Sequence, residues 1–218
     1  MKRTALTETA VRQLAAYGLS ADALTNCAVQ NYHVGEYIMR QGVENSNFFI
    51  VLSGISKVCG DAPNGKNLIL CYYVTQGVMG DVELMLDRFI ATTSVIAVSD
   101  FSCIAIPFFE NADRLRSNLT FVNAVGQALA QKLLRRGEEH MASALLTGEA
   151  RLCAFLQMAQ RNGVFREPLS DTAQSVAVSY RHVFRIMNKL CAQGILEKTE
   201  EGFRILDPEA LRRRSIPD

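Results

Sequence analysis

The stretch AQSVAVSYRHVFRIMNKL, residues 173–190, decides how the C-terminal part of the chain folds. Ala173 is small, as a residue must be where two helices cross closely, and a Val-Ala-Val run follows at the expected turn. Beyond the turn, Val183, Ile186 and Leu190 recur at helical spacing and predict an inward apolar face. The pattern therefore predicts two helices joined by a tight turn, a helix-turn-helix.

The outward face of the second helix is predicted to be cationic. Residues 172–196 contain Arg181, Arg185 and Lys189 but no Asp or Glu, and their i, i+4, i+8 spacing places the three cations on one face. Such a charge run is by itself often only a solvated face. Here, however, Ser179 is suited to cap the helix, whose N-terminal N–H groups favour a phosphate. The combination predicts a helix that lies in the major groove of DNA.

A β-hairpin is predicted directly behind this helix. Residues 195–198 and 203–206 are short runs of strand-forming character, and Glu200-Glu201-Gly202 provides a turn between them. Helix, turn, helix and hairpin together predict a winged helix-turn-helix at the C-terminus.

The first half of the chain has a different pattern of apolar and turn residues. Residues 1–27 show helical spacing of apolar residues, whereas residues 29–107 alternate short β-branched and aromatic runs with turn residues. Several short strands at this spacing predict an all-β sandwich or roll. The run Pro63-Asn64-Gly65 between two strands predicts a hairpin turn.

From residue 108 onward the apolar spacing becomes helical again. Two interpretations stay open: a core helix packed on its own domain, or a long helix that pairs with a twofold mate, which its length of about 30 residues favours. The residues of this predicted stripe are Leu115, Leu119, Val122, Val125, Leu129 and Leu133.

Composition excludes several classes of protein. The chain has 218 residues, 49% hydrophobic and 21% charged, which is typical of a globular protein. Its apolar runs are far shorter than the roughly 18 residues of a membrane span, and no leader segment is evident, so we expect a cytoplasmic protein without a membrane partner. No nucleophile elbow, zinc-protease or P-loop motif occurs, so an enzyme is not expected. The six cysteines lack metal-ligand spacing and are expected to be thiols.

Three stretches carry a resemblance to a known family. The chain is similar to the cyclic-AMP receptor/FNR family of bacterial transcription regulators over almost its whole length, and the run Val178–His182 resembles the YeiL-type branch of that family. The three stretches are GEYIMRQG (residues 35–42), FFIVLSG (residues 48–54) and VSYRHVFRI (residues 178–186).

The resemblance implies an α+β fold in three parts. An effector-sensing domain with N-terminal helices would span residues 1–110 and contain a jelly-roll (double-stranded β-helix) of the cyclic-nucleotide-binding type. A dimerisation helix would span residues 111–146 and a winged helix-turn-helix residues 147–218. The implied partners are a second copy of the chain, double-stranded DNA with a near-palindromic site, and RNA polymerase if the protein is an activator.

The resemblance also implies roles for the recognition helix. Ser179 would contact the DNA backbone, and Tyr180, Arg181 and Arg185, with Lys189, would form the DNA-binding set. The family usually has Glu where this chain has Arg181, and Arg where it has Tyr180. Because Arg favours the O6 and N7 atoms of guanine, we expect a target sequence different from the commonest one of the family.

The effector cassette of the family is altered in this chain. It would comprise Gly80, Asp81, Val82, Glu83, Arg88, Ala91 and Thr92. Glu83 replaces a small residue, and Ala91 occupies the position of the arginine that would neutralise a cyclic phosphate. The loss of that charged contact costs about 2–5 kcal/mol in a desolvated pocket, so cyclic AMP is disfavoured. Entry of Arg88 after a loop shift is the remaining route to a cyclic-nucleotide site.

Other classes of effector require particular ligand residues. Only Cys27 lies in the N-terminal region, which disfavours an iron–sulfur cluster, and His33 and His140 are haem-ligand candidates by type alone. Cys59 and Cys71 flank the predicted hairpin symmetrically and would lie opposite each other, as a redox pair or simply as two buried thiols. A small organic effector, or none, is the leading expectation. A ligand-binding or scaffold module that has lost DNA binding is the alternative function.

Overall fold

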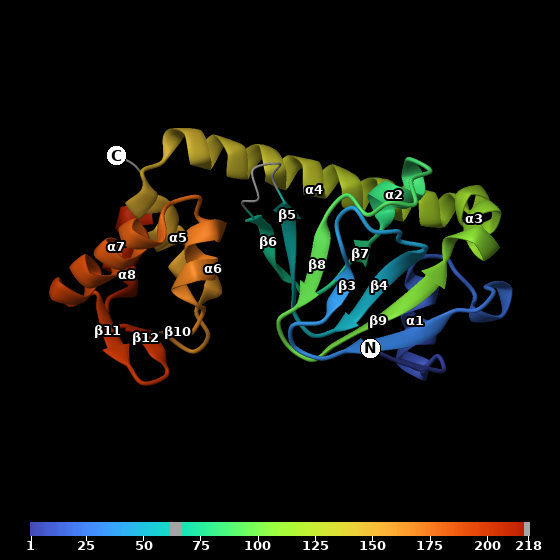
Figure 1. Ribbon diagram of the computed structural model, residues 1–218, viewed down its shortest axis with the longest axis horizontal. Coiled ribbons are helices and arrows are strands. Elements are labelled where there is room, and N and C mark those ends of the chain that lie inside the picture. Colours follow the sequence, from blue (N-terminus) through green and yellow to red (C-terminus); the bar gives the residue numbers. More distant parts are fainter. Residues whose placement is uncertain (62–66, 216–218) are drawn as a thin grey trace. The chain divides into compact units, whose positions relative to one another are not determined.

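The computed structural model describes residues 1–61 and 67–215, with the backbone alone at positions 61, 67, 68, 71–73, 139 and 143. The chain divides into two compact units, Met1–Leu134 and Arg135–Asp218, and the division falls within a long helix. Figure 1 shows the elements of each unit in sequence colours.

The first unit contains two antiparallel sheets and several helices. A five-stranded sheet has the order β1-β2-β9-β4-β7 and a four-stranded sheet the order β3-β8-β5-β6. The strands are β1 (Lys2–Thr4), β2 (Ala28–Tyr32), β3 (Tyr37–Met39), β4 (Asn47–Ser53), β5 (Ser56–Asp61), β6 (Asn67–Val74), β7 (Val78–Met79), β8 (Ser94–Ala97) and β9 (Phe101–Pro107). The helices are α1 (Glu8–Ala16), the 3-10 turn η1 (Ala21–Ala23), α2 (Asp81–Met85), α3 (Phe108–Ser117) and α4 (Leu119–Leu145), which continues into the second unit.

Both faces of strand β4 are buried, which explains its continuous apolar sequence. Phe49 and Val51 point between the two sheets, whereas Phe48 and Ile50 point to the opposite face of the five-stranded sheet. That second face is covered by α1, α3 and α4, and the ring of Phe48 meets that of Phe121 edge-on at 5.2 Å between centroids. The period of two along the strand thus assigns alternate residues to two separate cores.

The second unit is a small helical domain with a three-stranded sheet. The sheet order is β10-β12-β11, with every pairing antiparallel. Its elements are α5 (Gly148–Ala159), β10 (Val164–Phe165), α6 (Leu169–Ser175), α7 (Tyr180–Ala192), β11 (Leu196–Thr199), β12 (Gly202–Ile205) and α8 (Pro208–Ser215). The predicted winged helix-turn-helix is confirmed, with α6 and α7 as the two helices and β11–β12 as the wing (Figure 1).

The predicted continuous helix from residue 108 is interrupted. Asn118 adopts an extended backbone between α3 and α4, and its Oδ1 accepts a hydrogen bond from the Phe121 N–H at 3.0 Å. An Asn in this role caps the following helix and ends the preceding one. Its Nδ2 donates to the Gly18 carbonyl at 2.7 Å, which fixes the break to the N-terminal segment.

The hairpin turn predicted at residues 63–65 lies outside the described residues. Its flanking strands β5 and β6 pair antiparallel, but the pairing contains register shifts. Cys59 pairs with Ile69, and Cys71 pairs with Val58, so the expectation that the two cysteines lie directly opposite each other is wrong. The symmetric count about residue 65 failed because the pairs nearest the turn, such as Gly60 with Leu68, are centred on residue 64; the bulge between Val58 and Cys59 then shifts the register again.

Candidate nucleic-acid interface and effector cassette

The turn between α6 and α7 is held by side chains on both sides. The hydroxyl of Ser179 accepts from the His182 N–H at 3.2 Å, so the predicted N-cap of the second helix is confirmed. From α5, Arg151 donates through Nε to the Val176 carbonyl at 2.9 Å and through Nη2 to the Ala177 carbonyl at 3.4 Å. These contacts fix the direction in which α7 leaves the turn.

Helix α7 has one buried and one exposed face. Val183, Ile186, Met187 and Leu190 are buried, as the apolar spacing predicted. The exposed face comprises Tyr180, Arg181, Phe184, Arg185 and Asn188. Phe184 and Asn188 were not predicted as site residues, although their positions three and seven residues after Arg181 indicate the same face.

The two arginines of this face have no partner within the described part of the chain. No hydrogen bond or ion pair involves the side chain of Arg181 or Arg185 there, and both residues are exposed. Because no Asp or Glu occurs between positions 172 and 196, the positive charge is not neutralised along this segment. An unpaired guanidinium offers five N–H donors, which suit phosphate oxygens or a guanine edge.

Lys189 does not share that arrangement. Its Nζ lies 2.7 Å from Glu149 Oε2 on α5, and Arg214 of α8 contacts the other oxygen of the same carboxylate at 3.0 Å. The hydrogen bond from Lys189 lowers the pKa of Glu149 from its ordinary value. Residues at i and i+8 differ by about 80° around a helix with 3.6 residues per turn, so Lys189 has rotated toward α5. It is exposed and lies about 40° around the helix from Arg185, so it stays at the edge of the cationic face with its charge paired, and its contact with DNA stays a prediction.

Several other cations of this unit are also paired. Arg204 lies 3.0 Å from Glu197 across the wing, and Arg166 lies 2.6 Å from Glu201 at its tip. These exposed pairs contribute little to stability, but they reduce the positive charge of the wing. Among the described residues, α7 thus presents two unpaired cations, Arg181 and Arg185, on one face.

In the first unit, the predicted effector cassette is formed by α2 and the loop that follows it. Gly80 precedes the helix with φ of 77°, and a Cβ there would lie 2.7 Å from the Asn47 carbonyl oxygen, so this position requires glycine. Val82 is half-buried, whereas Asp81 and Glu83 are both buried. A buried carboxylate needs strong partners, and each of the two has them within the chain.

Asp81 is paired with a lysine that sequence reasoning did not identify. Lys132 Nζ on α4 donates to both carboxylate oxygens at 2.8 Å and to the Val78 carbonyl at 2.9 Å. The two residues are separated by 51 positions, so no local motif could have indicated the pair.

Glu83 closes the other side of the cassette. Its Oε1 accepts from both the N–H and the hydroxyl of Thr92, each at 2.7 Å. Ala91 beside them is buried, and Arg88 lies exposed with only its backbone N–H bound, to the Glu83 carbonyl at 2.9 Å. The polar groups that a ligand anion would need are therefore already engaged by a carboxylate of the chain.

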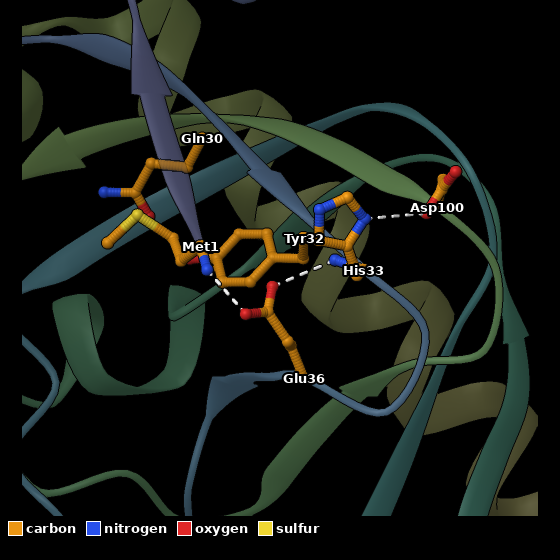
Figure 2. Close-up of polar contacts among 6 residues, drawn as sticks. All are labelled: Met1, Gln30, Tyr32, His33, Glu36 and Asp100. Atoms are coloured by element: carbon orange, nitrogen blue, oxygen red, sulfur yellow. Dashed lines mark hydrogen bonds and ion pairs between the residues drawn. The ribbon is translucent and has the colours of Figure 1, made fainter.

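The histidines considered as haem ligands lie on the surface. Figure 2 shows His33 with its Nδ1 3.2 Å from Asp100 Oδ1, and its side chain is 86% exposed. The backbone N–H of His33 donates to Oε2 of Glu36 at 2.9 Å, and Oε1 of Glu36 accepts from the terminal amine of Met1 at 2.6 Å. His140 is exposed as well. Within the described residues, no group of three or more His, Cys, Asp or Glu is arranged to hold a metal ion.

Burial raises the pKa of several thiols. The pKa rises to about 11 for Cys27, to about 12 for Cys103 and to about 11 for Cys153, and that of Cys191 is also raised. A thiol with a raised pKa carries little of the nucleophilic thiolate. These four cysteines are therefore poor sites for redox chemistry.

The predicted dimer stripe is divided between two environments. Leu115 belongs to α3, and with Val125 of α4 it is fully buried in the core of the first unit. Val122 and Leu129 pack partly against the same core. Only Leu119 and Leu133 are open to a partner, at 73% and 74% exposed. Four of the six stripe residues therefore pack in the core on the helix-covered face of the five-stranded sheet and are not available to a partner.

Two family models match the chain, one in each unit. The cyclic nucleotide-binding domain matches residues 29–114, and the Crp-like helix-turn-helix domain matches residues 150–214. Fold and site together define a transcription regulator with a nucleotide-binding-type β-roll and a DNA-binding winged helix-turn-helix. The chain belongs to the Crp/FNR family, whose members are regulators and not enzymes.

Known proteins resemble the chain along most of its length. Regulatory protein YeiL of Escherichia coli O157:H7 is 23% identical over 176 residues, which cover 81% of this chain and 80% of that protein. A crp/fnr-family regulator from Eubacterium rectale has a TM-score of 0.76 at 15% identity, covering 87% of this chain and 90% of that one. The c-di-GMP responsive regulator CLP of Xanthomonas campestris has a TM-score of 0.72 at 16% identity, covering 83% and 94%. At these identities the structures establish the shared fold.

None of the helices described is both long and apolar enough to cross a membrane.

Proposed function

We propose that the protein is a homodimeric, sequence-specific DNA-binding regulator whose β-roll does not respond to cyclic AMP. One observation carries the DNA-binding part. The exposed face of α7 presents Arg181 and Arg185 without partners among the described residues, whereas Lys189 of the same helix is neutralised by Glu149. Charge left unpaired on one face of a capped helix is matched by the phosphates and guanine edges of a major groove.

The dimer is supported by the exposed face of α4. Leu119, Leu133 and Leu134 are 73%, 74% and 68% exposed, which is unusual for three leucines on one helix. A second copy of the helix is the occupant we propose, since burial of such residues drives helix pairing. Two α7 helices in one dimer would then reach successive major grooves, about 34 Å apart.

The cassette supports an effector other than cyclic AMP. An anion entering it would meet the buried carboxylate of Glu83 on the Thr92 donors, the expected arginine position is occupied by Ala91, and Arg88 lies exposed. Lys132 does not supply that charge, because Asp81 neutralises it. A small organic effector, or constitutive activity, fits this arrangement better. The similar regulator CLP is described as c-di-GMP responsive, which makes c-di-GMP a further candidate to test.

Redox control is the narrower alternative. Four of the thiols have pKa values raised by burial, which disfavours their oxidation, and Cys59 and Cys71 are not paired directly in the register of β5 and β6. We place the regulator in the cytoplasm with DNA as its partner, and with RNA polymerase as a second partner if it activates transcription.

The first experiment is selection of bound sequences from random DNA with reduced, ligand-free protein. Recovery of an inverted repeat with half-sites one helical turn apart supports a dimeric regulator that is active without effector. If no site is recovered, the selection is repeated with cyclic AMP, c-di-GMP and an oxidant. Recovery only with cyclic AMP contradicts the closed cassette, and failure in every arm favours a scaffold module without DNA binding.

The assignment of the reading face is tested separately. Replacing both Arg181 and Arg185 with Ala is expected to abolish specific binding while the protein stays dimeric. Lys189→Ala is the matched control, because this residue has the same charge and helix but is bound by Glu149. Equal losses in the two variants would show that the face has been assigned wrongly.

A further inference from the structure

An aromatic pair lies on the exposed face of α7. Tyr180 and Phe184 are 53% and 48% exposed, and their rings are nearly parallel, with 6.5 Å between centroids and 15° between planes. One helical turn separates the two residues, so they form one continuous apolar strip. Figure 1 shows the helix that carries them, at the edge of the second unit.

The core of the unit does not require these rings. The inward face of α7 is filled by Val183, Ile186, Met187 and Leu190, which are all buried. At about 100° per residue, the exposed face runs around the helix from the aromatic pair, through Arg181, to Arg185. The apolar strip therefore lies directly beside the cations that would contact DNA.

We propose that Tyr180 and Phe184 read the 5-methyl group of thymine, next to the base pair contacted by the arginines. This inference rests on the proposed DNA-binding function. The thymine methyl is the apolar group that base pairs display in the major groove, and Phe contacts it favourably. Phe184 has no donor or acceptor in its side chain, so it cannot read a base edge by hydrogen bonds. The half-site therefore contains thymine at one or two positions that adjoin the guanine.

The test removes only the methyl group from the DNA. In the site selected by the wild-type protein, thymine is replaced by uracil at one half-site position at a time, symmetrically in both halves. The full-length protein is titrated at fixed salt. Burial of one methyl group changes affinity about 4-fold, so the loss of one from each half-site is expected to weaken binding about 16-fold at the contacted position.

Two variants assign the effect to the aromatic pair. In Phe184→Ala, affinity for the thymine site falls and the difference between thymine and uracil disappears. Leu206→Ala is the matched control, since it removes another apolar side chain, 51% exposed, from the same unit, and it keeps the full difference. Non-specific binding at low salt is unchanged in Phe184→Ala, which shows that the domain remains folded.

Three results overturn the inference. If uracil has no effect at any position while specific binding persists, thymine methyls are not read and the proposed DNA-binding function stands alone. If Phe184→Ala and Tyr180→Ala both keep the sensitivity to uracil, a residue outside the aromatic pair reads the methyl. If no specific site is recovered with any effector, the inference and the proposed function fail together.

Discussion

Ala177 holds the turn of the helix-turn-helix in a conformation that its side chain disfavours. Its φ is 51°, in the left-handed region. The other non-glycine residues with positive φ in the described chain are Asn26, Asp87 and Asn162, whose short polar side chains tolerate this conformation. Alanine has no such compensation, and because Ala177 is exposed, its methyl group contributes little packing.

Ala177→Gly is expected to stabilise this turn. Left-handed backbone costs an L-residue about 1–2 kcal/mol, and glycine avoids that cost. Glycine loses about 0.5–1 kcal/mol through the greater freedom of its unfolded chain. The net effect is to raise the free energy of local opening of the turn by about 0.5–1 kcal/mol. The amides of α6 and α7 would then exchange about 2- to 5-fold more slowly.

Hydrogen exchange of the α6–α7 amides in the full-length protein measures this gain. The method reports local opening and does not require the two units to unfold together. Asn162→Gly is the control, with little expected change, because asparagine already tolerates its φ of 52°. Unchanged or faster exchange in Ala177→Gly would refute the argument that alanine is strained there.

Three further predictions concern charge and packing. Glu149→Gln should remove about 0.5–1 kcal/mol of stability at neutral pH and flatten the acid limb of the stability profile. The lowered pKa of Glu149 gives stability that is present above the ordinary carboxyl range and lost as the pH falls through the folded pKa, so a profile unchanged by the substitution would contradict it. Lys132→Met should cost the first unit about 3 kcal/mol in denaturant titrations, because it leaves the charge of Asp81 buried and unpaired. Adding Asp81→Asn should recover part of the lost stability. If it recovers none, the unpaired charge of Asp81 is not the cause of the destabilisation. Leu115→Ala should cost about 3 kcal/mol of stability and leave the dimer intact, whereas Leu133→Glu should dissociate the dimer in sedimentation without unfolding. If instead Leu115→Ala dissociates the dimer and Leu133→Glu leaves it intact, Leu115 belongs to the dimer interface.

Local patterns predicted the second unit well. The cap at Ser179, the inward face of α7 and the wing follow from residues within a few positions of one another. Such features depend on helix periodicity and turn chemistry, which a short segment contains in full. Most strands between residues 29 and 107 were also predicted, because β-branched and aromatic runs such as those of β4 and β9 alternate with turn residues, whereas β1 lies in the stretch expected to be helical.

Sequence patterns did not reveal those features of a residue's environment that depend on distant segments. Lys189 has the charge and spacing of a DNA contact, but α5 supplies Glu149 as its partner, 40 positions away. Leu115 has the spacing of a dimer stripe, but the outer face of a sheet buries it. The register of β5 and β6 depends on bulges, which residue counting does not reveal.

The sequence alone determined the order of the parts and the helix-turn-helix, because both depend on residue type and on spacing within single segments. The family resemblance implied the loss of the arginine that a cyclic phosphate would need. Only the tertiary structure decided which charges are paired: Lys132 and Lys189 are neutralised, while Arg181 and Arg185 have no partner in the part of the chain that the structure describes. A charge interacts over a few ångströms of space and not along the chain, so its partner becomes known only when the fold brings distant residues together.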